Sequence, residues 1–355
     1  MCKVIDGLDI EAQKQTNLRN LKRDCTKFGI FILSFAVLRF AADFFGVLIS
    51  KTDFYKNLGD MQRSLVSSGI SLVFFYLIPL GICYFLFPKL SFKRNNHHYP
   101  GSEYTAVQAL SKFPAAYSLS IFTNLATLGI IALICKLLGT SSPQNIVSQT
   151  IEQSSGVYIT GLITTAVIPA FFEEILFRGA LLGALRPYGD KAAIILSAFF
   201  FGLAHGNVFQ FAYAMVLGLF FGYIYVRTNS LKITMIYHFL VNGTAVTLQY
   251  LTDRGFTFMS DKAIGENQGA DGIYFVLMTS LVIAVYAVVL IGIIQIIKML
   301  VNYIGSKRHD SYISFLINDC EGVSEAKKYA VFFTRPTVIT ATVLMIASFV
   351  VSLII

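Results

Sequence analysis

GVYITGLITTAVIPAFFEEILFRGALLGA, residues 156–184, is the stretch that decides the fold of this chain. It is longer than the roughly 20 residues that a helix needs to cross about 30 Å of bilayer hydrocarbon. Its only charged residues are Glu173, Glu174 and Arg178. Ionisable groups are costly inside a bilayer, so three of them within two helical turns indicate a functional site. The stretch therefore predicts a membrane helix that carries chemistry.

The rest of the chain is equally apolar. Of the 355 residues, 55% are hydrophobic and 14% charged, and the mean hydropathy is +0.66. This composition excludes a soluble domain. The expected fold is all-α, a polytopic transmembrane helical bundle of about eight to nine spans in the cell membrane. The expected spans are 28–50, 67–88, 117–135, 156–184, 192–206, 208–226, 233–250, 273–297 and 336–355.

The net charge of +8 is explained by membrane topology. If the N-terminus is cytoplasmic, the loops on that side carry 20 Lys and Arg, whereas the opposite loops carry six. This asymmetry is the positive-inside pattern, so no nucleic-acid partner is needed. Residues 1–27 are expected to form a separate amphipathic helix on the inner membrane surface. In the first span, Arg39 and Asp43 are four residues apart, which predicts a neutralising ion pair. The alternative is that they form a gate or a substrate contact.

The two acids of the decisive stretch differ in their neighbours. Residues four apart share a helix face, so Glu174 and Arg178 are expected to form an ion pair. Glu173 points elsewhere and has no partner on its own helix. An unpaired carboxylate at low dielectric suits a general base. The alternative is that both acids line a polar cavity or a proton path.

Two later spans contain the only membrane-placed histidines. In the span 192–206, Phe201 precedes His205 by four residues, so the two rings are expected to pack together. In the span 233–250, His238 and Asn242 share a face and are expected to present polar groups to one cavity. A single membrane histidine is more often a hydrogen-bonded packing residue. Two of them downstream of paired carboxylates favour a catalytic site.

The ordered motifs EExxxR, FxxxH and HxxxN resemble those of the CAAX protease and bacteriocin-processing (CPBP, Abi) family of intramembrane endopeptidases, which includes the Ras-converting CAAX prenyl proteases. The resemblance covers about 156–250. It implies an enzyme in which Glu173, helped by His205, activates a water, and in which His238 and Asn242 stabilise the oxyanion. It further implies structural support of the site by Glu174, Arg178 and Phe201.

The resemblance is compatible with two mechanisms, one that uses a zinc ion and one that uses no metal. The family has long been classed among the metalloproteases, and Glu173, His205 and His238 could hold zinc in an open site. The chain has no HExxH motif, however, and relatives with these motifs look glutamate-dependent. The expectation is that no cofactor or metal is needed.

The expected substrate is a peptide or protein that reaches the site from the membrane or its cytoplasmic face. The composition looks bacterial, so the resemblance implies processing of a secreted peptide or bacteriocin precursor. The alternative is a non-proteolytic membrane protein for bacteriocin self-immunity. A proton-coupled transporter would need paired broken helices in corresponding halves, which the sequence does not show.

Three regions are expected. Residues 1–155 are expected to form the N-terminal cytoplasmic segment and three transmembrane helices. Residues 156–250 are expected to form a CPBP-like catalytic four-helix core. Residues 251–355 are expected to form a C-terminal loop, a cytoplasmic segment and two more transmembrane helices. Three glycine pairs with four-residue spacing predict close helix packing in the core. They are Gly179/Gly183, Gly202/Gly206 and Gly218/Gly222.

Overall fold

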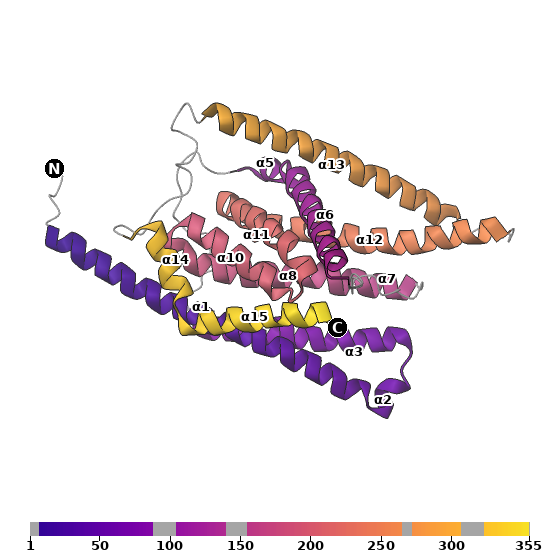
Figure 1. Ribbon diagram of the computed structural model, residues 1–355, viewed down its shortest axis with the longest axis horizontal. Coiled ribbons are helices and arrows are strands. Elements are labelled where there is room, and N and C mark those ends of the chain that lie inside the picture. The colour runs from indigo at the N-terminus through magenta and orange to yellow at the C-terminus, as the bar shows by residue number, and fades with distance from the viewer. Residues whose placement is uncertain (1–6, 88–103, 140–154, 265–271, 307–322, 355) are drawn as a thin grey trace.

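The computed structural model describes residues 7–87, 104–139, 155–264, 272–306 and 323–354, and the regular elements within these ranges are all helical (Figure 1). Most of the helices run along the long axis of the molecule and pack side by side. Large apolar side chains remain exposed along its outer helices, as expected of surfaces that face lipid. The predicted all-α polytopic bundle is confirmed.

The described ranges contain the helices given below in chain order. They are α1 (Gly7–Ser50), α2 (Asp53–Lys56), α3 (Asp60–Ser71), η1 (Leu72–Leu77), α4 (Ile78–Leu86), α5 (Ala106–Leu110), α6 (Phe113–Leu137), α7 (Ser155–Gly161), η3 (Leu162–Val167), α8 (Ile168–Glu173), η4 (Glu174–Leu182), α9 (Gly183–Leu185), η5 (Arg186–Tyr188), α10 (Asp190–Ala204), α11 (Val208–Thr228), α12 (Leu231–Ile264), α13 (Gly272–Ser306), α14 (Glu325–Phe333) and α15 (Pro336–Ile354).

Within the described residues, six helices are long and apolar enough to cross a membrane. A seventh span results if α14 and α15, bent by 72°, count as one. The sequence-based number of eight to nine also counted α10 and α12. With 15 residues, α10 is about 22 Å long at 1.5 Å per residue, which is short of the hydrocarbon thickness. α12 is long enough, but its polar side chains make it less apolar than the other six.

α1 corrects the expectation of a separate surface helix before the first span. The helix continues without a break from Gly7 to Ser50, and Leu21 and Cys25 are buried. α15 packs along it, and the rings of Phe28, Phe200 and Phe332 meet at centroid distances of 4.9–5.8 Å. The N-terminal stretch is thus tied into the core that supports α10.

The predicted close packing is confirmed between α10 and α11, which form a hairpin. Gly218 of α11 lies against the backbone of Ala198, where a Cβ would be 2.9 Å from Cα. Gly202 of α10 likewise faces the carbonyl oxygen of Phe211 at 2.8 Å from an ideal Cβ. Without glycine at these points the two helices would have to move apart.

We therefore expect Gly218→Ala to destabilise the protein by about 1–3 kcal/mol, the cost of overpacking a close-packed interior. Gly129→Ala on α6 is the matched control, because its Cβ would meet nothing within 4 Å. That variant should be neutral or slightly stabilising, since alanine favours helix by about 1 kcal/mol over glycine. Heat-induced precipitation in detergent compares the two; equal midpoints would contradict the close approach.

Candidate functional site

One continuous helix with π-helical turns carries the two acids. Between Ser155 and Leu182 the backbone alternates between α- and π-helical turns, and Glu173 and Glu174 lie at one such junction. π-Helical turns recur at functional sites. Pro169, just before the acids, has no N–H, so the Thr165 carbonyl four residues earlier has no α-helical donor. Asn242 Nδ2 of α12 donates to that oxygen at 2.9 Å.

Glu174 joins the first and last motifs. Its side chain is fully buried, and its Oε1 accepts from Arg178 Nη1 and from His238 Nδ1, both at 2.9 Å. The predicted Glu174–Arg178 pair is confirmed. The contact to His238 was not predicted, because a sequence does not show which residue of a distant helix completes a pair. Glu174 therefore orients His238 as well as neutralising Arg178.

Arg178 is held by aromatic rings as much as by charge. Its guanidinium carbon lies 4.2 Å from the ring centroid of Phe201 and 5.1 Å from that of Phe221. Among the described residues, its Nε and Nη2 have no hydrogen-bond partner. Cation–π contacts of this kind stabilise a desolvated guanidinium. Phe201 also packs edge-on against His205, at a centroid distance of 5.0 Å, as expected.

Glu173 points away from this cluster, and its side chain is 17% exposed. It lacks a partner on its own helix, as expected, but Tyr76 Oη of η1 donates to its Oε1 at 3.1 Å. Its Oε2 lies 3.9 Å from His238 Nε2. Tyr76 is a site residue that sequence reasoning missed, because one tyrosine among 18 carries no distinguishing signal.

The hydrogen bonds fix which imidazole nitrogens remain for chemistry. His205 Nδ1 lies 2.8 Å from the carbonyl oxygen of Phe201, which can only accept, so Nδ1 carries the proton. The neutral ring then has a free lone pair on Nε2. His238 Nδ1 likewise donates to the Glu174 carboxylate. Its Nε2 can accept a proton, and once it has done so it becomes a donor.

Arg39 corrects the prediction of an ion pair within α1. Its Nη1 donates instead to the backbone oxygen of His205 at 3.0 Å, while Asp43 is exposed. Gly206 follows with φ +65°, and a Cβ there would clash with the Arg39 guanidinium. The turn that ends α10 beside His205 is therefore fixed by a charged donor from the first helix.

One cavity of about 970 Å³ brings the sequence-predicted residues together. Glu173, His205, His238 and Asn242 all line it, and so does Phe201. They come from three helices that are far apart in sequence. Glu174 and Arg178 lie behind this wall in the buried core. The arrangement combines a partly exposed carboxylate, an imidazole lone pair and an amide donor around one space.

The same side chains do not form a metal centre as they stand. Across the described ranges, no three His, Cys, Asp or Glu side chains converge as a metal ion would require. If zinc bound, Glu173 and the Nε2 atoms of His205 and His238 would be its ligands, and the ion would polarise a carbonyl or a water. Their present arrangement does not fit such a centre.

Comparisons with known proteins agree with the motifs. Residues 155–244 match the family model described as type II CAAX prenyl endopeptidase Rce1-like. The chain is 26% identical over 89 residues to the "Putative membrane peptidase YdiL" of Bacillus subtilis (strain 168). That match spans 25% of this chain and 36% of the relative's length. No solved structure matches the chain. The resemblance to the CAAX protease family is therefore confirmed over the segment that holds all three motifs.

Proposed function

We propose that the protein is an intramembrane endopeptidase that hydrolyses a peptide bond with a water activated by Glu173. The observation that carries this proposal is the shared cavity lined by Glu173, His205, His238 and Asn242. The match to a CAAX prenyl endopeptidase family supports the reaction class. The test is incubation of the purified protein with prenylated and unprenylated peptides, followed by mass spectrometry. Internal cleavage by the wild type but not by Glu173→Gln is the expected result.

Water activation uses the two groups that keep free lone pairs. Glu173 Oε2 accepts a proton from a water that is also hydrogen-bonded to His205 Nε2, and the hydroxide attacks the scissile carbonyl carbon. The C=O π electrons move to oxygen and form a tetrahedral oxyanion. Glu173 then passes its proton to the departing amine, the C–N bond breaks, and a carboxylic acid and an amine result. The Tyr76 hydrogen bond holds Glu173 in position meanwhile.

The oxyanion would be stabilised by Asn242 and His238. Asn242 uses one amide hydrogen on Thr165 and keeps the other for the substrate. His238 can donate from Nε2 only as imidazolium, because its Nδ1–H is bound to Glu174. Fixed donors in a site shielded from water are effective at developing charge.

We expect Asn242→Ala to lower kcat by about 10²–10³, the usual cost of removing one oxyanion donor, with little change in KM. Gln249→Ala is the control, because Gln249 lines the same cavity about 10 Å further along α12. That variant should change KM more than kcat. An Asn242→Ala enzyme with unchanged kcat and raised KM would make Asn242 a substrate-binding residue only.

We propose that no metal is needed, because the lone pairs and donors present suffice for water activation and oxyanion binding. Activity should survive dialysis against a strong chelator with a loss of less than about twofold. Elemental analysis of the same active samples provides the second measurement. One zinc per chain, lost together with activity and restored with it, would instead assign Glu173, His205 and His238 as ligands.

A non-proteolytic role in bacteriocin self-immunity is the alternative. The buried Glu174–Arg178–His238 cluster would then serve folding alone. Immunity that persists in Glu173→Gln cells would favour this alternative, because Glu173 is the acid that the buried cluster does not use.

A further inference from the structure

The cavity is closed at one end. One turn beyond Glu173 lies Phe177, which is buried together with Phe201 and Tyr237. Phe177 and Phe201 pack edge-on at a centroid distance of 5.2 Å, and the Arg178 guanidinium lies over the ring of Phe201. In this direction η4 is buried from Leu176 to Leu182, and none of these residues lines the cavity.

In the opposite direction the cavity is lined by both polar and apolar side chains. On α12, polar residues that line the cavity continue from His238 to Asp253, about 22 Å along the helix at 1.5 Å per residue. Across from them, one face of α3 presents a row of hydroxyls to the same space. This serine face consists of Ser64, Ser67, Ser68 and Ser71. Polar side chains within membrane helices face the protein interior or a water-filled cavity.

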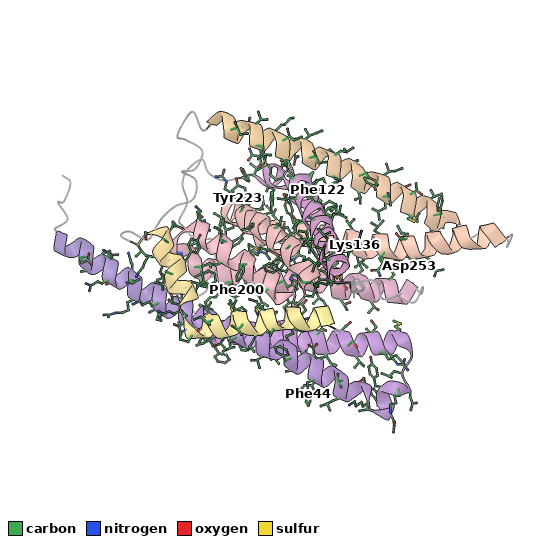
Figure 2. All side chains as sticks on the ribbon, in the orientation of Figure 1. Phe44, Phe122, Lys136, Phe200, Tyr223 and Asp253 are labelled. Carbon is green, nitrogen blue, oxygen red and sulfur yellow. The ribbon has the colours of Figure 1, made fainter. Side chains whose placement is uncertain are left out.

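Three of the helices that line the cavity, η3, α3 and α12, agree on its direction. From the site, the cavity extends backward along η3 to Thr164, backward along α3 to Ser64, and forward along α12 to Asp253. Figure 1 shows the N-terminus and α14 at one end of the long axis, with α2, α7 and the far end of α12 at the other. Asp253 lies toward that second end, away from Phe200 and Tyr223 (Figure 2). The cavity therefore leads away from the N-terminal end.

Charge assigns these ends to the two sides of the membrane. With the spans expected from the sequence, the loops on the side of the N-terminus carry 20 Lys and Arg and the opposite loops carry six, so the positive-inside rule assigns the N-terminal side to the cytoplasm. From cavity direction and charge together we infer that the site is reached from the extracytoplasmic side, and that the substrate is an exported peptide or an extracytoplasmic segment of a membrane protein. This side is opposite to the cytoplasmic face, which the sequence predicted, beside the membrane itself, as a route of access.

The lining points to an uncharged, extended stretch of peptide. Hydroxyls of the serine face can donate to and accept from a peptide backbone without selecting a side chain. Apolar side chains, among them Leu72, Ile168 and Leu217, line the same space and suit neutral residues. A volume of about 970 Å³ accommodates several residues rather than a folded domain. The substrate class rests on the proposed function, whereas the direction of access does not.

Cysteine labelling tests the access side without any assay of cleavage. In full-length protein in intact cells, with the five native cysteines replaced, Ser71→Cys is treated with a charged, membrane-impermeant maleimide. We expect labelling from outside. Gly69→Cys is the matched control at the same depth: it is exposed on the helix surface, and its Cβ meets nothing within 4 Å. A lipid-facing thiol there should stay unlabelled. Ser50→Cys and Ser324→Cys mark the two membrane sides.

Each other outcome overturns the inference. If Ser71→Cys, like Ser324→Cys, reacts only after the cells are permeabilised, the cavity opens to the cytoplasm. Failure of Ser71→Cys to react from either side, while Ser50→Cys reacts, would show that the cavity is closed to water. Labelling of Ser324→Cys from outside in intact cells would invert the topology itself.

A reporter experiment tests the substrate class. Two membrane-anchored reporters carry the same uncharged cleavable stretch, one on the exported side of its anchor and one on the cytoplasmic side. We expect at least tenfold more cleavage of the exported stretch, abolished in Glu173→Gln cells. Preferential cleavage of the cytoplasmic reporter would overturn the substrate class. Cleavage of neither would count against the proposed function, and the labelling result would still decide the side of access.

Discussion

Glu173→Gln should lower the rate of cleavage by about 10²–10⁴, the range that a positioned general base contributes. Glutamine cannot take the proton of the attacking water. The substitution is otherwise conservative, since the amide oxygen can still accept from Tyr76. Glu173 also lies on the cavity wall with a partly exposed side chain, so no buried charge is stranded. The thermal midpoint of the purified variant should therefore match that of the wild type.

Tyr76→Phe separates positioning from proton transfer. It removes the hydrogen bond to Glu173 but leaves the carboxylate, so kcat should fall far less than in Glu173→Gln. A Glu173→Gln enzyme that retains more than a tenth of wild-type activity would remove Glu173 from the role of base.

The sequence predicts the members of the site better than their contacts. Spacing by four correctly paired Glu174 with Arg178 and Phe201 with His205, because neighbours on one helix face are fixed by helical geometry. It gave the wrong partner for Arg39, which bonds to the backbone of a residue 166 positions away. A backbone acceptor leaves no trace in the sequence. Local geometry is therefore predictable from spacing, whereas contacts between distant helices are not.

The number of spans shows the same limit. Apolar stretches at 192–206 and 233–250 correctly predicted helices. The first was counted as a span although a helix of 15 residues is too short to cross the bilayer. The polar groups of α12 made it less apolar than a lipid-facing span, and they are the groups that line the cavity. The least membrane-like helices are thus those that build the site.

Arg178→Ala should destabilise the protein by about 3–5 kcal/mol, because it strands a buried carboxylate. Glu174 is fully buried and would keep the hydrogen bond from His238 Nδ1, at 2.9 Å, without the neutralising guanidinium. The rings of Phe201 and Phe221 would also lose the guanidinium packed between them. The rate of cleavage per folded molecule should fall too, because Glu174 would lose the charge of Arg178 and would no longer hold His238 in its present position. The midpoint of thermal unfolding in detergent and the rate per soluble molecule measure the two effects.

Arg186→Ala is the matched control that separates the loss of a buried ion pair from the loss of an ion pair beside the cavity. Arg186 and Asp190 form a second buried pair with the same four-residue spacing, joined at 2.8 Å between Nε and Oδ1, but they do not line the cavity. Breaking this pair should cost stability for the same reason, while cleavage by the molecules that remain folded stays at the wild-type rate. Removing both charges in Glu174→Gln/Arg178→Met should recover part of the stability without restoring activity, because no carboxylate then orients His238. The contrary result is that Arg178→Ala and Arg186→Ala lower stability equally and both leave cleavage intact. In that case the Glu174–Arg178 pair would serve the fold alone. The contact of Glu174 with His238 would then have no part in catalysis.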